Sequence, residues 1–254
     1  AGAGGDTVLY LLSTQNDVYM NITPHLNNYD IRTGGSDKID PEYPHLVKGN
    51  KTPQKEYTNL FVNEIKRLSK EKQSFIIKSH YFYKEFDEQL KDTVNIVDLG
   101  FDQVYLPFVV NSNIVKTDTV EWSKLPDKTF LDPTLWKLLE KASPHEHKSV
   151  ITWCVVKNHL ECIRKYNLDQ SPVLVNDMFE RPNLTEEYFK SQGYNLSFDT
   201  EYFHLWNKIN LPLLPSDQYK EYLKSKQYNY QDKSLNLVER YIFLALSGKN
   251  FQFL

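Results

Sequence analysis

Two short segments contain the residue types that could bind an anion and move a proton. The first is the glycine-rich run Gly2-Ala3-Gly4-Gly5-Asp6-Thr7, which precedes an apolar stretch. Free backbone N–H groups at a helix start attract phosphate or sulfate, and glycines let such an anion approach the backbone closely. The second is Phe75–His80, an apolar strand pattern that ends in Lys78-Ser79-His80. Because side chains alternate along a strand, Lys78 and His80 would share one face, where the histidine can accept a proton near neutral pH.

Alternating strands and helices would position these two segments. The first helix is expected over 6–17 and a second over 57–68, where apolar residues recur at helical spacing. The residues at 149–156 are apolar nearly throughout, as in a strand covered on both faces, and a helix over 158–166 follows directly. Asp132-Pro133 predicts a helix start, before 134–141. The remaining predicted strands are 75–79, 95–99, 104–110 and 172–175.

The last third of the chain reads as helices. They are expected over 185–192 with Gly193 after it, 199–208, 216–226, and 233–247 with Gly248 after it. We therefore predict an α/β fold: one domain over 1–254, with a three-layer, P-loop-type parallel sheet flanked by helices. Residues from about 180 to 254 would form a helical extension packed on it. A polar loop over 21–54 is long enough to help choose a substrate.

Composition restricts the function classes. A net charge of −3 over 254 residues gives no overall reason to expect nucleic acid as a partner. Cys154 and Cys162 form no zinc or disulfide pattern, which favours a reducing compartment and a cytoplasmic location. No long apolar run predicts a membrane span. The oligomeric state stays open.

The order of these motifs resembles the P-loop sulfotransferases. In that family a loop of the Ser-Gly-Thr-Thr kind binds the 5′-phosphosulfate of 3′-phosphoadenosine 5′-phosphosulfate, and Gly4-Gly5-Asp6-Thr7 corresponds to it. A later strand ends in Lys-Thr-His, whose histidine is the base in many members, and Lys78-Ser79-His80 corresponds to that.

A third similarity follows the predicted strand 149–156. The family places Arg-Asn-Pro-x-Asp there, then a helix with a serine, and the arginine and the serine hold the 3′-phosphate. Here Lys157 stands in place of the arginine and Lys165 in place of the serine, with Arg164 adjacent. The segment 172–178 resembles the family strand that carries Tyr-Glu-Asp-Leu, so the resemblance extends from residue 1 to about residue 180.

The resemblance implies transfer of a sulfuryl group to a hydroxyl or amine of a small-molecule or carbohydrate acceptor. The co-substrate would be 3′-phosphoadenosine 5′-phosphosulfate, and no metal would be needed. It implies that His80 deprotonates the acceptor and that Lys78 stabilises charge on the bridging oxygen. The donor would be held by Gly4, Gly5, Asp6 and Thr7 at the phosphosulfate and by Lys157, Arg164 and Lys165 at the 3′-phosphate.

Two alternatives stay open. One is phosphoryl transfer from a nucleotide, although the chain lacks the Gly-Lys-Ser/Thr ending of a triphosphatase loop. The other is a non-catalytic binding or structural protein on the same scaffold. Ala3 stands where the family carries Lys or Arg, Asp6 adds a negative charge, and Lys157 lacks the two-pronged geometry of arginine.

Two other groups have residue types that could do chemistry. His145-Glu146-His147 could ligate a metal, but it reads as a solvated loop after Pro144. Cys162 lies near His159 in sequence, although burial of this cysteine is the simpler expectation.

Overall fold

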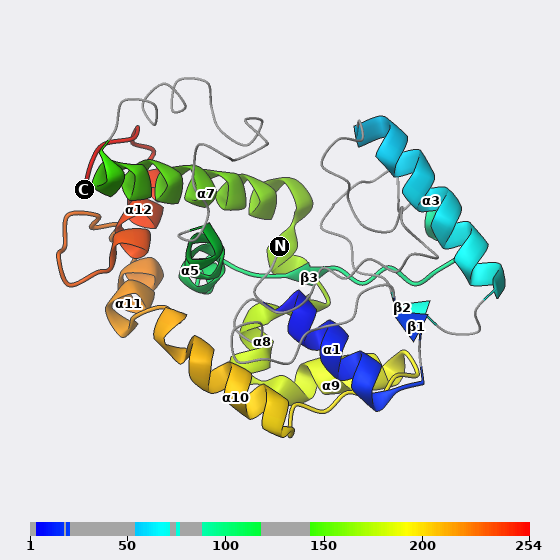
Figure 1. Ribbon diagram of the computed structural model, residues 1–254. Coiled ribbons are helices and arrows are strands. Elements are labelled where there is room, and N and C mark those ends of the chain that lie inside the picture. Colours follow the sequence, from blue (N-terminus) through cyan, green and yellow to red (C-terminus); the bar gives the residue numbers. More distant parts are fainter. Residues whose placement is uncertain (1–3, 18, 21–53, 72–74, 77–87, 118–142) are drawn as a thin grey trace. The chain divides into compact units, whose positions relative to one another are not determined.

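The computed structural model describes residues 4–17, 19–20, 54–71, 75–76, 88–117 and 143–254. Most of these residues are helical (Figure 1). Strands β1 (Tyr19–Met20) and β2 (Phe75–Ile76) pair in parallel, with Tyr19 opposite Phe75. Strands β3 (Leu99–Gly100) and β4 (Val173–Leu174) form a second pair. The described residues thus combine many helices with two small sheets, of which β1–β2 is parallel, and the predicted three-layer sheet is not seen among them.

The chain divides into two compact units, each made of two stretches of sequence. Unit 1 is Ala1–Leu99 with Pro172–Ile209, and unit 2 is Gly100–Ser171 with Asn210–Leu254. The single domain expected from the sequence stays a prediction.

Unit 1 contains α1 and the helices that follow β4. Val8, Leu9, Leu11 and Leu12 bury one side of α1 (Gly5–Gln15). Side-chain amides fix its far end: Gln15 exchanges two hydrogen bonds with the backbone of Ser197 at 2.7 and 2.9 Å. Asn16 does the same with the backbone of Asn195 at 2.7 and 2.8 Å. The other helices are α8 (Val175–Glu180), α9 (Pro182–Ser191) and α10 (Glu201–Asn210).

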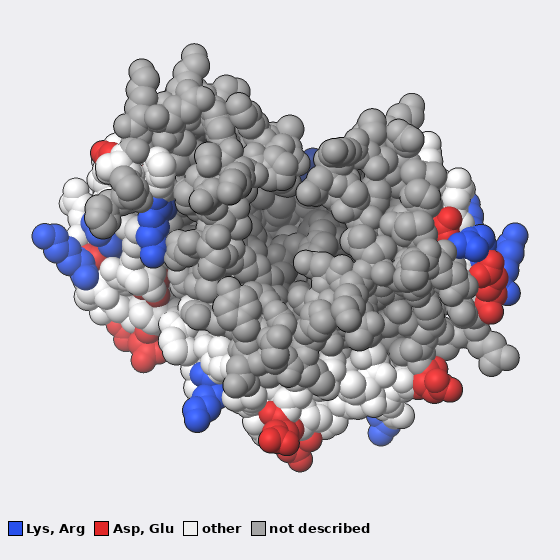
Figure 2. Space-filling view, viewed as in Figure 1, with Lys and Arg blue, Asp and Glu red and all other residues white. Residues whose placement is uncertain are grey.

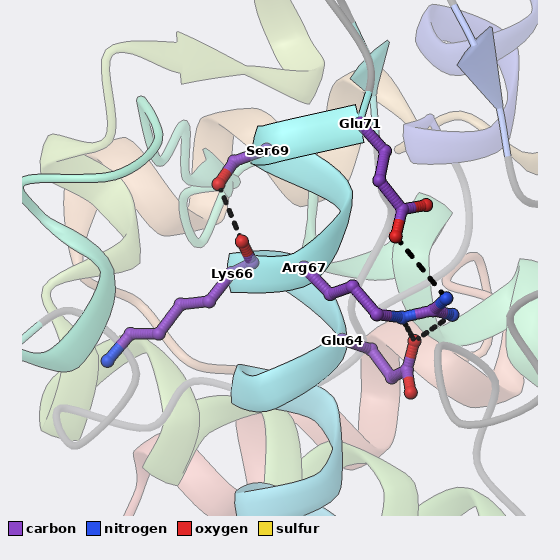
Figure 3. Close-up of polar contacts among 5 residues, drawn as sticks. All are labelled: Glu64, Lys66, Arg67, Ser69 and Glu71. Atoms are coloured by element: carbon purple, nitrogen blue, oxygen red, sulfur yellow. Dashed lines mark hydrogen bonds and ion pairs between the residues drawn. The ribbon is translucent and has the colours of Figure 1, made fainter.

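Helix α3 (Gln54–Glu71), also in unit 1, separates an apolar stripe from a charged one. Val62, Ile65 and Leu68 are buried at the spacing of one helix face. On the exposed side Arg67 bonds Glu64 through Nε at 3.1 Å and Nη2 at 2.8 Å, and reaches Glu71 at 3.5 Å (Figure 3). Exposed pairs of this kind add only a few tenths of a kcal/mol each, so the apolar stripe is the larger stabilising term.

Unit 2 is built around α7 (Pro144–Tyr166), against which α5 (Leu106–Thr117) and α12 (Leu237–Leu246) pack. Aromatic rings fill its core: Tyr219 stacks on Phe243 with ring centroids 4.8 Å apart. The Tyr219 hydroxyl donates to the carbonyl of Gln103 at 2.6 Å, which satisfies a buried polar group. The remaining elements are α11 (Asp217–Ser225) and the short 3₁₀ turns η4 (Leu168–Gln170) and η5 (Leu211–Leu213).

The strand predicted at 149–156 is wrong: these residues lie in the middle of α7. The helix begins at Ser143, where Ser143 and Glu146 form a capping box and Pro144 takes the first turn. It ends at Asn167, whose φ of 50° is left-handed. An unbroken apolar run fits a helix covered on several sides as well as it fits a buried strand. The loop expected at 145–147 is also wrong, because α7 already starts at Pro144.

The strand predicted at 104–110 is also wrong, because α5 covers most of it. The Asp102 side chain accepts the Tyr105 N–H at 3.0 Å and turns the chain into the helix. Pro107 lies in the first turn, where its missing N–H costs no hydrogen bond. All residues from Tyr105 to Val110 are buried, so no polar face marks the helical period.

Most other predicted elements are confirmed with shifted ends. The helices at 6–17, 57–68 and 158–166 lie within or over α1, α3 and α7, and the four late helices correspond to α9, α10, α11 and α12. Gly193 and Gly248 follow α9 and α12 with φ of +85° and +70°. The strand at 172–175 contains β4, and within 95–99 only Leu99 is strand. Of the strand predicted at 75–79, Phe75–Ile76 are strand, and the other three residues lie outside the described part. The helix at 134–141 and most of the loop at 21–54 lie outside the described residues.

Replacing Glu239 with alanine tests the capping that starts α12. Glu239 is fully buried and accepts the N–H groups of Ser216 at 2.7 Å and Asn236 at 3.1 Å. Its loss leaves two N–H groups without this acceptor, so the free energy of unfolding should fall by about 2–4 kcal/mol in urea titrations. The exposed Glu221→Ala in α11 is the control and should cost under about 0.5 kcal/mol. Equal effects of the two substitutions would contradict the capping role.

Candidate functional site

The glycine-rich segment forms the beginning of α1. Gly4 is the N-cap residue and no side chain caps the helix there. The first backbone N–H groups of a helix have no partner within it, so this end can accept an anion. Thr7 is fully buried one turn further on. Its buried hydroxyl oxygen has no hydrogen-bond partner among the described residues.

Packing explains the glycine at position 4. Gly4 is buried, and a Cβ placed on it would lie 2.8 Å from Met178 Sδ and 3.5 Å from Val175 Cγ2. A Cβ on Gly5 would lie at an ordinary 3.5 Å from Leu99. A side chain at position 4 would have to displace Met178 of α8, so packing favours glycine here whether or not an anion binds.

The three basic residues predicted at the 3′-phosphate lie together on α7. Lys157 and Arg164 are seven residues apart, about two turns or 10 Å, and so lie on nearly the same face. Lys157 and Lys165 are exposed, and their ammonium groups lie 5.6 Å from the Trp153 ring and 5.1 Å from the Tyr166 ring. A hydrogen bond with Tyr166 raises the pKa of Lys165. Arg164 and Lys165 also lie in the last turn, where cations stabilise the helix dipole.

The predicted site residues are thus found in two groups. Gly4–Thr7 come together in unit 1, and Lys157, Arg164 and Lys165 come together in unit 2. Lys78 and His80 lie outside the described residues. On the face drawn in Figure 2 the described Lys and Arg side chains are interspersed with Asp and Glu, in keeping with a net charge of −3.

The other chemistry-bearing residues have structural roles. Glu146 accepts the N–H and the hydroxyl of Ser143 at 2.7 and 2.8 Å, and these bonds lower its pKa. Burial raises the pKa of the Cys162 thiol, which disfavours the thiolate that a nucleophile needs. Among the residues that the structure describes, no three His, Cys, Asp or Glu side chains group as metal ligands. Nor does the described part contain a helix long and apolar enough to cross a membrane.

His159 is a buried ionisable group whose environment the sequence did not reveal. Its Nδ1 donates to the Val155 carbonyl at 2.7 Å, and its ring lies 5.8 Å from that of Phe101. Burial lowers the pKa of His159 to about 4, so the imidazole is neutral at pH 7. In a helix over 149–166, His159 follows the buried Thr152 and Val156 at helical spacing, which places it on the buried face of α7.

No protein-family model, curated protein or solved structure matches this chain. The function must therefore be argued from the chain's own residues.

The buried His159 predicts a loss of stability in acid. Because its pKa falls from 6.5 to about 4 on folding, only the unfolded chain binds this proton between those values. The contribution is present above pH 6.5 and is lost as the pH falls toward 4, by up to about 3 kcal/mol. Urea titrations from pH 7.5 to 4 should show a shallower pH dependence for His159→Met than for the unsubstituted chain.

Asn158→Gln, at an exposed position of the same helix, removes no ionisable group and is the control, which should leave that dependence unchanged. Equal slopes for the unsubstituted chain and His159→Met would contradict the buried, neutral imidazole.

Proposed function

We propose that the start of α1 binds the phosphosulfate end of an adenosine-based donor, as the first half of a sulfotransferase-like reaction. The uncapped N-terminus at Gly4 and Gly5 carries this proposal. Backbone N–H groups of Gly5, Asp6 and Thr7 would bond the anion, and the positive end of α1 would favour its charge. The 3′-phosphate would be bound by Lys157, Arg164 and Lys165.

The reaction proposed for this donor is a direct sulfuryl transfer. The sulfur–oxygen bond to the donor phosphate breaks as a bond to the acceptor oxygen or nitrogen forms. His80 takes the acceptor proton, Lys78 stabilises charge on the bridging oxygen, and adenosine 3′,5′-bisphosphate leaves. The acceptor would be a small molecule or a carbohydrate, and no metal takes part.

A second candidate is a non-catalytic binding or structural protein, and two observations favour it. Residues 149–156 are helical, so Lys157 does not follow a strand as the corresponding arginine does in sulfotransferases. Gly4 also has a packing reason of its own, in its contact with Met178. Under this candidate the chain keeps an uncapped helix start but binds no donor.

Calorimetry with adenosine 3′,5′-bisphosphate and ATP separates the two candidates. Donor binding predicts a preference for the bisphosphate, weakened about tenfold or more by Lys157→Met because one charge-assisted contact is lost. Lys148→Met, on the same helix two and a half turns earlier, should change affinity little.

Asp6→Asn should tighten binding by removing a negative charge near the anion, whereas Asp17→Asn beyond the other end of α1 should not.

Failure of the folded chain to bind either nucleotide would overturn the donor site and leave the non-catalytic candidate. Binding without sulfuryl transfer would overturn only the catalytic step. If transfer occurs, His80→Ala should abolish it while leaving bisphosphate affinity unchanged.

A further inference from the structure

Two tyrosines in unit 2 have hydroxyl groups with oppositely charged partners. The Tyr222 hydroxyl donates to Asp232 Oδ2 at 2.8 Å. The Tyr230 hydroxyl instead accepts from the Lys249 ammonium at 2.8 Å. Both side chains are partly exposed, so a reagent in solution can reach them. A carboxylate opposes loss of the phenol proton and an ammonium favours it, so the two tyrosines should differ in reactivity.

Several groups surround Tyr230 and favour negative charge on its oxygen. Lys249 Nζ also lies 4.7 Å from the centre of the tyrosine ring. The Lys249 bond is the largest cause of a lowered Tyr230 pKa, and a hydrogen bond from the Gln252 side chain adds to it. The Arg240 guanidinium donates to the Tyr230 carbonyl at 3.0 Å and fixes the backbone there. The pKa of Tyr222 is raised, with the Asp232 hydrogen bond as its largest cause.

Aromatic packing fixes the chain between Lys249 and Gln252. Phe251 lies between them in sequence and stacks on Tyr241, with ring centroids 6.1 Å apart and planes 10° from parallel. Its ring also lies 6.2 Å from Trp153. The Tyr241 hydroxyl donates to the Gln252 carbonyl at 3.2 Å. The backbone that carries Gln252 is thus anchored to the core of unit 2, close in sequence to Lys249.

We propose that Tyr230 is a nucleophilic tyrosine that takes up small activated acyl groups, with Lys249 stabilising its phenolate. The phenol loses its proton to water, and Tyr230 Oη attacks the acyl carbon. A carbon–oxygen bond forms, the bond to the leaving group breaks, and the leaving group takes a proton from solvent. The product is an acyl ester of Tyr230, with no change of oxidation state. This reaction is independent of the proposed donor site.

Limited acetylation of the full chain with N-acetylimidazole tests the proposal. Peptide mass spectrometry would give the rate at each tyrosine, and reversal by hydroxylamine would separate tyrosine esters from acetyl-lysine. Tyr230 should react about threefold faster or more than Tyr222 for each unit between their pKa values. The fraction of phenolate changes tenfold for each unit of pKa. A phenolate of lower pKa is also a weaker nucleophile, and by analogy with thiolates this cancels about half of the gain on a logarithmic scale.

Lys249→Gln keeps a hydrogen-bond donor but removes the charge, and should reduce the Tyr230 rate toward that of Tyr222. The exposed Lys233→Gln in the preceding loop is the matched control and should leave the rate unchanged. Absorbance titration at 295 nm should show one phenol moving to higher pH in Lys249→Gln. A Tyr230 rate no faster than that of Tyr222 in the unsubstituted chain would overturn the proposal without any variant. Equal Tyr230 rates in the two lysine variants, both folded by circular dichroism, would overturn it as well.

Discussion

The burial of α7 by α5 and α12 is the constraint on which the rest of unit 2 depends. Four apolar residues are buried along this helix: Val150, Ile151, Trp153 and Val156. Burying apolar surface stabilises the fold by about 25 cal/mol for each Å² removed from water. The same packing leaves Lys157, Arg164 and Lys165 exposed and buries His159. It also provides Trp153 and Tyr241, against which the Phe251 ring packs. The positions of the basic residues, the buried histidine and the Tyr230–Lys249 pair therefore all follow from one packing arrangement.

The sequence predicts helices well where apolar residues recur every three or four positions among polar ones, or where capping residues mark the ends. Helices α3 and α9 through α12 follow from such patterns, and Ser216 and Asn236 do cap α11 and α12. Prediction fails at α5 and α7, where burial on several sides removes the polar face that would reveal the period. The types and spacing of Ser143 and Glu146 are those of a capping box and indicate a helix start. The long apolar run at 149–156 nevertheless favours a strand when only the sequence is considered. Contacts such as Tyr230 with Lys249 join residues 19 apart and depend on how α12 turns the chain back.

In the candidate site, too, the role of each residue depends on its neighbours in the fold. Gly4 and Thr7 fit the start of an anion-binding helix by residue type, yet the close approach of Met178 also favours a glycine at position 4. The three basic residues on α7 gather because helical periodicity places 157 and 164 on one face, and not because a strand ends before them. Residue types at the right spacing indicate a chemistry, but the fold decides which groups meet.

The helical state of 149–156 is the central structural claim, and NMR of the full chain tests it most directly. Cα secondary chemical shifts should be positive without interruption from Glu146 to Lys165, with contacts between the Hα of each residue and the amide three residues later. Slow amide exchange over Val150–Val156 should accompany them, since this part of α7 is buried. Negative Cα shifts over 149–156 with strand-like contacts to another segment would contradict the account. They would restore the strand that the sulfotransferase resemblance requires before Lys157.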